Sequence, residues 1–388
     1  MRRAAVAALV FLACWGAVHF WFYRYDLIGD VGIYRGYAEL VRHGAVPYRD
    51  FAFEYPPGAL PPLLAPAYLG GYQHAFGLLM GVLGAALAAL LARDAPLRGL
   101  AFAAVSPLLV GALVLNRFDL WPALLATAAL LALLHDRHRL GFALLAAGFT
   151  AKLWPLLLVP LAAAWTLRRR GGRELARAGA AAAAVAAAAL VPFAALAPHG
   201  LWSSLWGQLS RPLEIETLGG ALLMLTGHAG IDMSHGSYNA AGVAVRPLEA
   251  LTGAALATTL AVLWVAFARG PAEHERLVRY AAASVCAFVA LGKVLSPQYL
   301  IWLVPLVALL RGRRGAWAVA LLSAALVLTQ VLYPSRFYDY VYGHRLAWLV
   351  LLRDLLLVGF VAQLALPHGV WRRRPRERLE TRVSQAGG

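Results

Sequence analysis

A group of ionisable and aromatic residues follows the first apolar segment of the chain. That segment, residues 4–23, is long enough to cross a bilayer core. After it come Asp30 and Tyr34, the sequence Gly-Ala-Val-Pro-Tyr at 44–48, and Glu54 shortly before two prolines. A carboxylate held near a membrane surface can act as a general base on a reacting hydroxyl. A protein that only anchors or packs has little reason to place such residues on its first exit loop. They therefore predict a site for a substrate that lies partly in the membrane.

Composition indicates the class of protein. Of the 388 residues, 61% are hydrophobic and only 14% are charged, and the mean hydropathy is +0.66. These values exclude an ordinary soluble domain and predict an all-α, polytopic membrane protein. Cys14 and Cys286 both fall inside apolar runs, which argues against a disulfide or a metal-binding pair.

Apolar runs predict about twelve transmembrane helices. The first is too long and too aromatic at its outer end for a cleaved signal, so we expect a signal-anchor helix. Residues 31–43 predict a short amphipathic helix, and the short apolar segment 58–69 is expected to lie in the outer leaflet or re-enter it. The predicted spans are residues 4–23, 73–92, 99–115, 120–134, 140–151, 153–167, 178–197, 247–267, 278–292, 299–310, 316–333 and 346–366.

The net charge of +16 is explained by orientation rather than by a nucleic-acid partner. With a cytoplasmic N-terminus, 23 of the 35 basic residues fall on the cytoplasmic side, which favours both termini there. The same arrangement places two large segments outside the cell, residues 24–72 and 198–246. Residues 1–370 are then a single membrane domain. The basic tail, residues 371–388, is predicted to be disordered and to lie on anionic headgroups.

Further candidates occur at the outer ends of later spans. Arg117 and Asp119 either pair with each other or, alternatively, Arg117 holds a phosphate that Asp119 helps to orient. Lys152 separates two short spans and is one of only two lysines, the other being Lys293. Both lysines could snorkel to the interface, while the functional alternative is a point charge for a lipid phosphate.

Three more polar residues lie in outer segments. Arg211 is a candidate for phosphate or acceptor binding, with a solvated loop as the plainer alternative. Gln298 and Tyr299 could contact sugar hydroxyls, although an interfacial tyrosine needs no such role. Arg353 and Asp354 fall inside the last span, where we expect them to pair with each other or face the bundle.

Several kinds of chemistry are not indicated. The glycine pairs do not form a phosphate-binding loop followed by a lysine, and the histidines lack ligand spacing on a helix. Nucleotide-dependent chemistry is therefore not expected. No cofactor is predicted, with a divalent cation near Glu54 as the alternative.

The order of these motifs resembles a known family. The chain is similar to the GT-C class of integral membrane glycosyltransferases, and specifically to glycosyltransferase family 87, the polyprenol-phosphate-mannose-dependent mannosyltransferases. The similarity extends over roughly residues 20–310. The motifs that carry it are Asp30 with Tyr34, Gly44/Pro47/Tyr48, Glu54-Tyr55-Pro56-Pro57, Asn116-Arg117-Phe118-Asp119, Thr150-Ala-Lys152-Leu-Trp-Pro155, and Ser296-Pro297-Gln298-Tyr299 before Trp302 and Pro305.

The resemblance implies a fold and a reaction. It implies a GT-C-like bundle with a catalytic aspartate on a long first extracytoplasmic loop bearing juxtamembrane helices. That aspartate is Asp30 here, with Asp26 one helical turn earlier as its rival. Glu54 matches an acidic position near the donor phosphate or the reacting sugar. One carboxylate suffices for this reaction. It takes the proton of the acceptor hydroxyl, and polyprenyl phosphate leaves without protonation by a general acid.

The expected activity is inverting transfer of a hexose, foremost mannose, from a polyprenyl-phosphate sugar to a lipid-linked or cell-envelope glycan. The protein is expected in the cell membrane, with its active site at the extracytoplasmic face. One alternative is an arabinofuranosyl- or glucosyltransferase of the same architecture. The other is a transporter or flippase of lipid-linked sugar, although transporters usually repeat their site in two halves and no counterpart of the acidic loop occurs later in the chain.

Overall fold

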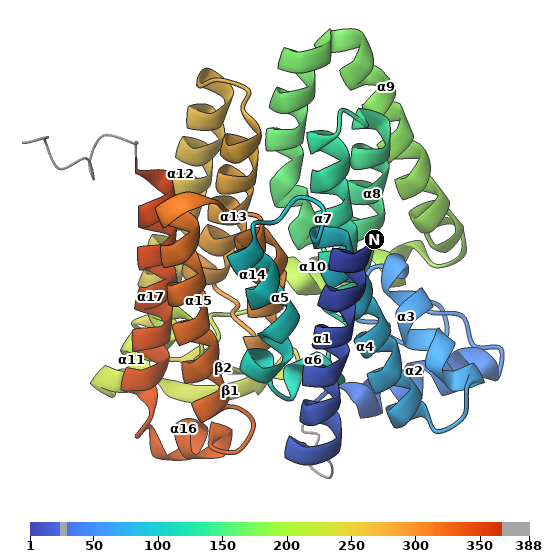
Figure 1. Cartoon of the computed structure of the whole chain (residues 1–388). Coiled ribbons are helices and arrows are strands. Elements are labelled where there is room, and N and C mark those ends of the chain that lie inside the picture. The colour runs from blue at the N-terminus through green and yellow to red at the C-terminus, as the bar shows by residue number, and fades with distance from the viewer. Residues whose placement is uncertain (24–28, 367–388) are drawn as a thin grey trace, which may run out of the picture.

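The computed structural model describes residues 1–23 and 29–366. These residues are mainly helical, as predicted, with one two-stranded hairpin that was not predicted (Figure 1). The predictions made for Asp26 and for the tail 371–388 lie outside the described residues.

Six helical segments among the described residues are long and apolar enough to cross a membrane, by length and composition. This finding supports the prediction of a membrane protein, whereas the number twelve stays a prediction. The six are α1 (Arg2–Ala17) continued by the π-helix η1 (Val18–Phe22), α4 (Tyr72–Leu91), η4 (Trp154–Leu158) continued by α9 (Val159–Leu196), α12 (Val245–Arg269), α15 (Gly312–Leu332) and α17 (Ala347–Ala365).

Shorter helices coincide with other predicted spans. α9 also joins two predicted spans, 153–167 and 178–197, as the arms of one helix that bends at Gly171, where φ is 80°. Glycine adopts this conformation more readily than other residues, which explains why the helix bends at this position. The bend therefore falls within the arginine-rich segment 168–173. The shorter helices are α5 (Leu97–Val110), α7 (Leu120–Leu134), α8 (His138–Ala151), α13 (His274–Leu291) and η5 (Pro297–Tyr299) continued by α14 (Leu300–Ala308).

The remaining elements lie away from the bend of α9, and we call this part of the bundle the loop end. In Figure 1, α2 and α3 lie at its lower right and the hairpin with α16 at its lower left, far from the bend of α9 at the top. These elements are α2 (Val31–Arg42), η2 (Pro57–Ala59), α3 (Leu60–Leu64), η3 (Ala65–Tyr68), α6 (Leu113–Asn116), α10 (Pro198–Leu209), α11 (Leu218–Thr226), β1 (Gly230–Ser234), β2 (Ser237–Ala241) and α16 (Phe337–Gly343).

Two apolar cores hold the molecule together. The larger one runs through the bundle, in which α1 packs on α4 and α5, α8 packs on α7 and α9, and α17 packs on α13 and α15. The smaller one, at the loop end, packs α11 and the segment around Leu213 and Ile215 against α16 and α17. Burial of these side chains fixes the backbone of residues 211–217, which carries several charged residues.

The hairpin supports the same segment. β1 and β2 pair antiparallel around His235 and Gly236, which have φ values of 54° and 69°. Two consecutive positive φ values are typical of a tight two-residue hairpin turn. The Ile215 amide donates to the Tyr238 carbonyl and the Ala240 amide donates to the Leu213 carbonyl, so the hairpin braces residues 213–215.

Candidate functional site

A buried ion pair lies at the centre of the loop end. α8 ends at Ala151, and Lys152 is extended (φ −159°, ψ 135°) before the chain turns back into η4. Its ammonium Nζ lies 2.7 Å from Oδ1 of Asp119, whose side chain is only 1% exposed. The same oxygen accepts a hydrogen bond of 2.6 Å from Nε1 of Trp302. Lys152 and Trp302 thus both donate to the buried Asp119 carboxylate, because a buried charge requires such compensation.

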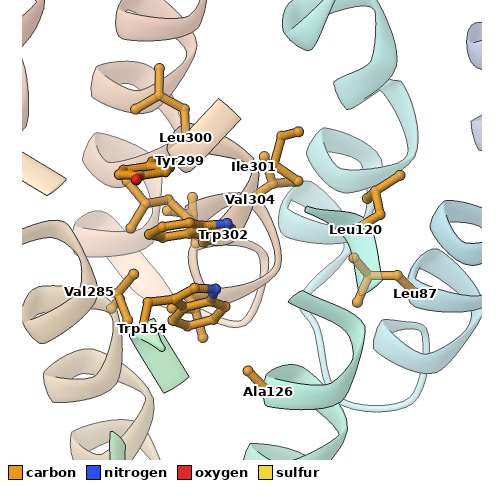
Figure 2. Close-up of a cluster of buried hydrophobic side chains, with 14 of the residues drawn as sticks. Leu87, Leu120, Ala126, Trp154, Val285, Tyr299, Leu300, Ile301, Trp302 and Val304 are labelled. Carbon is orange, nitrogen blue, oxygen red and sulfur yellow. The ribbon is translucent and has the colours of Figure 1, made fainter. Parts of the chain in front are cut away.

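Aromatic rings surround this ammonium. Nζ of Lys152 lies 5.1 Å from the ring centre of Phe118 and 5.3 Å from those of Tyr299 and Trp302. Tyr299, Trp302 and Trp154 stack in turn, with ring centres 4.1 Å and 5.0 Å apart (Figure 2). Such faces attract a cation, so Lys152 lies in a rigid aromatic frame.

A second ion pair joins Asp30 to Arg117. The Tyr34 hydroxyl donates to Oδ2 of Asp30 over 3.3 Å, and Nη2 of Arg117 donates to the Tyr333 hydroxyl over 3.4 Å. Burial raises the pKa of the Tyr34 phenol, so this hydroxyl keeps its proton at neutral pH. The Asp30 side chain is 26% exposed, in contrast to Asp119, and is therefore the more accessible of the two carboxylates.

The sequence left open whether Arg117 pairs with Asp119. In the described residues Arg117 pairs instead with Asp30, and Asp119 pairs with Lys152. Arg117 is extended (φ −128°, ψ 137°) after α6, whereas Asp119 is the residue directly before α7, so the two side chains separate. Phe118 lies between the two pairs, because its ring centre is 5.8 Å from that of Tyr34, which donates to Asp30, and 5.1 Å from Nζ of Lys152.

One cavity of about 430 Å³ opens beside Lys152, and we call it the apolar cavity. Lys152, Arg211 and Lys293 place cations on its wall. The volume lies within the range of small-molecule sites, roughly 300–1,000 Å³. The complete lining is Tyr55, Pro56, Lys152, Leu153, Trp154, Leu156, Leu157, Gln208, Leu209, Arg211, Glu249, Gly253, Leu256, Phe288, Gly292, Lys293, Val294, Tyr299 and Trp302.

A second cavity of about 530 Å³, which we call the polar cavity, lies between the first loop, α10 and the hairpin turn. Gln208 and Arg211 line both cavities, so the two meet there. The complete lining of the polar cavity is Tyr37, Tyr48, Arg49, Asp50, Phe51, Ala52, Phe53, Glu54, Gly200, Ser203, Ser204, Gly207, Gln208, Arg211, His235 and Gly236.

Close backbone contacts position the first loop. Gly200 of α10 lies against the Tyr48 carbonyl so closely that a Cβ would come within 1.9 Å of that oxygen. Nε2 of Gln208 donates to the Glu54 carbonyl over 3.0 Å. Only glycine permits the first contact, so the sequence of α10 determines how the loop and its carboxylate are presented.

Buried polar atoms at the junction retain hydrogen-bonding capacity. Arg211 is 9% exposed and pairs with Glu214, which in turn accepts from the Leu295 amide. Its Nε has no hydrogen-bond partner among the described residues, and the same holds for Oγ of Ser204 and Oε1 of Gln298. Such groups are costly to leave unpaired. Ser204 and Arg211 line the polar cavity, whereas Gln298 lines neither cavity.

The charges in the last span behave as predicted. Nε of Arg353 lies 2.8 Å from Oδ1 of Asp354, and both side chains are buried. Nη1 of Arg353 also lies 3.8 Å from Glu216, whose pKa burial raises to about 8. This cluster anchors the segment 211–217 to α17 and has no cavity of its own among those described.

The predicted site residues are only partly brought together. Tyr299, Lys152 and Arg211 line the apolar cavity, Glu54 and Arg211 line the polar cavity, and Asp119 holds Lys152. Gln298 is buried beside Tyr299. Asp30 and Arg117 line neither cavity and adjoin them through Phe118.

Other lining residues were not among the site residues predicted from the sequence. Gln208 had no distinguishing motif. Lys293 was singled out because lysine is rare in the chain, and it was weighed both as a snorkelling side chain and as a point charge for a lipid phosphate. It pairs with Glu249 over 3.1 Å at the wall of the apolar cavity. Trp302 appeared only as part of a motif.

No group of three or more His, Cys, Asp or Glu suited to a metal ion occurs in the part of the chain that the structure describes. The cation near Glu54 therefore stays an untested alternative.

Comparison with protein families supports the resemblance. The model of glycosyltransferase family 87 matches residues 53–297, more than half of the chain. This range contains Glu54, Lys152 and Arg211, while Asp30 precedes it. A comparison with curated proteins found no match.

Proposed function

Because the chain belongs to glycosyltransferase family 87, we propose that it transfers a hexose, foremost mannose, from a polyprenyl-phosphate donor to a lipid-linked or cell-envelope glycan. The observation that carries this proposal is the apolar cavity, which combines three cations with hydrophobic walls. A lipid phosphate has two complementary parts, an anion that would pair with the cations and an apolar chain that would contact the hydrophobic walls.

The donor phosphate would lie among Lys152, Arg211 and Lys293. Each cation already has a carboxylate partner, namely Asp119, Glu214 and Glu249 respectively. Lysine carries three donors and arginine five, so these pairs retain N–H groups for a phosphate. Charge-assisted hydrogen bonds of this kind are about twice as strong as neutral ones.

The prenyl chain would lie along the leucine-rich wall. Leu156 and Leu157 come from the start of the span that continues into α9, and Leu256 comes from α12. Both segments are candidate membrane spans. A chain leaving the cavity between them would pass directly into lipid, where burial of its methylene groups is favourable.

The reaction requires one base. The acceptor hydroxyl oxygen attacks the anomeric carbon, the bond from that carbon to the phosphate oxygen breaks, and polyprenyl phosphate leaves with the electron pair. The acceptor proton passes to a carboxylate. Inversion follows from the single displacement, and the cations stabilise charge on the departing phosphate.

We assign the base to Asp30. The resemblance to the family implies this role. Tyr34 and Arg117 orient this partly exposed carboxylate, which lines neither cavity in the described structure. A second candidate is Glu54, favoured by one observation. Glu54 lines the polar cavity, which Asp30 does not. Variants of the two carboxylates separate these assignments.

The loop end is proposed to face outside the cell, with both termini in the cytoplasm. The distribution of arginine supports this orientation. The bend of α9 collects Arg168, Arg169, Arg170 and Arg173 at the top of Figure 1, away from α10 and the hairpin, which line the polar cavity.

Purified protein incubated with labelled polyprenyl-phosphate sugars and an envelope-lipid extract tests the proposal. A new glycosylated product, identified by mass spectrometry and absent without protein, is expected. Movement of intact sugar-lipid across vesicles with no new glycosidic bond would favour a flippase instead. A product formed only from arabinosyl or glucosyl donors would assign a different sugar to the same site.

A further inference from the structure

We propose that the polar cavity binds the acceptor, and that this acceptor is a glycan chain reached from water rather than a headgroup presented by the bilayer. The inference rests on the proposed transferase function and adds the acceptor class and its site.

The two cavities differ in the structural elements that line them. None of the residues that line the polar cavity comes from any of the six candidate spans in the described part of the chain. Its walls come from α2, the loop 48–54, α10 and its C-terminal continuation, and the hairpin turn. The apolar cavity, in contrast, takes Trp154, Leu156 and Leu157 from one span and Glu249, Gly253 and Leu256 from another. The polar cavity therefore opens outside the apolar layer.

The chemistry of the polar cavity fits a sugar. The rings of Tyr37 and Phe51 are half-buried and nearly parallel, with centres 5.8 Å apart. Such rings offer flat apolar surfaces for the C–H face of a pyranose. Ser203, Ser204 and Gln208 supply hydroxyl and amide groups for sugar hydroxyls, in the mixture of aromatic and polar lining that ligand sites use.

Two buried polar atoms lie next to the polar cavity. Oγ of Ser204 and Nε of Arg211 have no hydrogen-bond partner among the described residues, and both residues line the cavity with other atoms. Neither atom is accessible from the cavity in this conformation. A sugar hydroxyl, which can donate and accept, would therefore pair with them only after these side chains turn toward the cavity.

The junction of the cavities places the two substrates end to end. Gln208 and Arg211 line both spaces, while the adjacent residues Glu54 and Tyr55 line one each. A glycan in the polar cavity would thus present its terminal hydroxyl to a sugar carried on a phosphate beside Arg211. The glycan chain would extend outward past His235 and Gly236, at the hairpin turn.

Two glycines allow a matched test. Gly207 lines the polar cavity from α10 and Gly253 lines the apolar cavity from α12. A Cβ added at either position meets no atom within 4 Å, so a leucine would extend into open space without a backbone clash. Replacing a helical glycine also removes a destabilising residue, so both variants should fold.

The experiment measures binding and does not require turnover. Binding of soluble manno-oligosaccharides would be measured by saturation-transfer NMR, and binding of a labelled polyprenyl-phosphate sugar by equilibrium partition, on the full chain in detergent. Gly207→Leu should weaken oligosaccharide binding roughly tenfold or more, equivalent to about 1.4 kcal/mol, and leave donor binding unchanged. Gly253→Leu should do the reverse.

Unchanged oligosaccharide binding by Gly207→Leu, or its loss in Gly253→Leu, would overturn the assignment of the cavity. If wild-type protein binds only lipid-linked glycans and no soluble ones, the proposal of a water-reached acceptor is overturned. A failure of the transferase proposal is recognised separately, because wild-type protein would then form no glycosidic product while the binding measurements remain interpretable.

Discussion

Replacing Lys152 tests whether this residue is a structural charge, a phosphate ligand or both. Lys152→Met leaves the Asp119 carboxylate buried, with Trp302 as its remaining hydrogen-bond donor. Removing one partner of a buried ion pair typically costs about 3–5 kcal/mol. The single variant should therefore be clearly less stable, and a loss of its activity alone would say little about phosphate binding.

The double variant separates the two roles. Asp119→Asn with Lys152→Met removes both charges and keeps a hydrogen-bond acceptor for Trp302, so most of the lost stability should return. Phosphate binding should not return, because the cation is still missing. Loss of one charge-assisted contact, about 1.5–3 kcal/mol, corresponds to roughly ten- to hundredfold weaker donor binding.

Thermal unfolding in detergent gives the stabilities, and partition of a labelled polyprenyl-phosphate sugar gives the donor dissociation constants. The expected result is a double variant of near wild-type stability with weakened donor binding. Wild-type donor binding by that variant would refute the role of Lys152 as a phosphate ligand. Wild-type stability of Lys152→Met alone would refute the reasoning about the buried pair.

Two further predictions concern orientation and pH. In a background lacking Cys14 and Cys286, Gly32→Cys and Gly172→Cys should react with an impermeant maleimide from opposite sides of sealed vesicles. Both glycines are exposed, and a Cβ on either meets no atom within 4 Å. Labelling of both from the same side would contradict the proposed topology. Burial raises the pKa of Glu216 from 4.5 to about 8, so the folded protein retains a proton that the unfolded chain releases, and stability should fall as pH rises from about 4.5 to 8. Glu216→Gln should reduce this decline in the free energy of unfolding by up to a few kcal/mol at neutral pH. Unfolding of both proteins would be measured from about pH 4.5 to 8. An equally steep decline in the variant would argue against the raised pKa of Glu216.

Charged residues at the ends of apolar runs could be identified from the sequence. Arg117, Asp119 and Lys152 stand out because the neighbouring residues are apolar, and the pairing of Arg353 with Asp354 followed from the cost of burying either one. The partners of Asp119 and Arg117 were not predicted. Asp119 directly precedes α7 and Lys152 follows α8, an adjacent antiparallel helix, so that pairing was accessible from topology.

Other features depend on packing that no local pattern encodes. Gln208 reaches the junction of the cavities only because Gly200 lets α10 approach the first loop closely. The hairpin was missed because its strands are short and partly exposed, and because His235 is an uncommon residue at positive φ. The position of Asp30 beside the cavities, rather than within one, likewise requires the tertiary structure.

The most direct test of the account is transfer of labelled mannose from polyprenyl phosphate by wild-type protein and by Asp30→Asn. The asparagine keeps the size and hydrogen bonding of the aspartate but cannot accept the acceptor proton, so product formation should fall by roughly 10²- to 10⁴-fold, with donor binding largely retained. Glu54→Gln, measured in parallel, should be much milder. Normal transfer by Asp30→Asn, or a greater loss in Glu54→Gln, would contradict the assignment of Asp30 as the base.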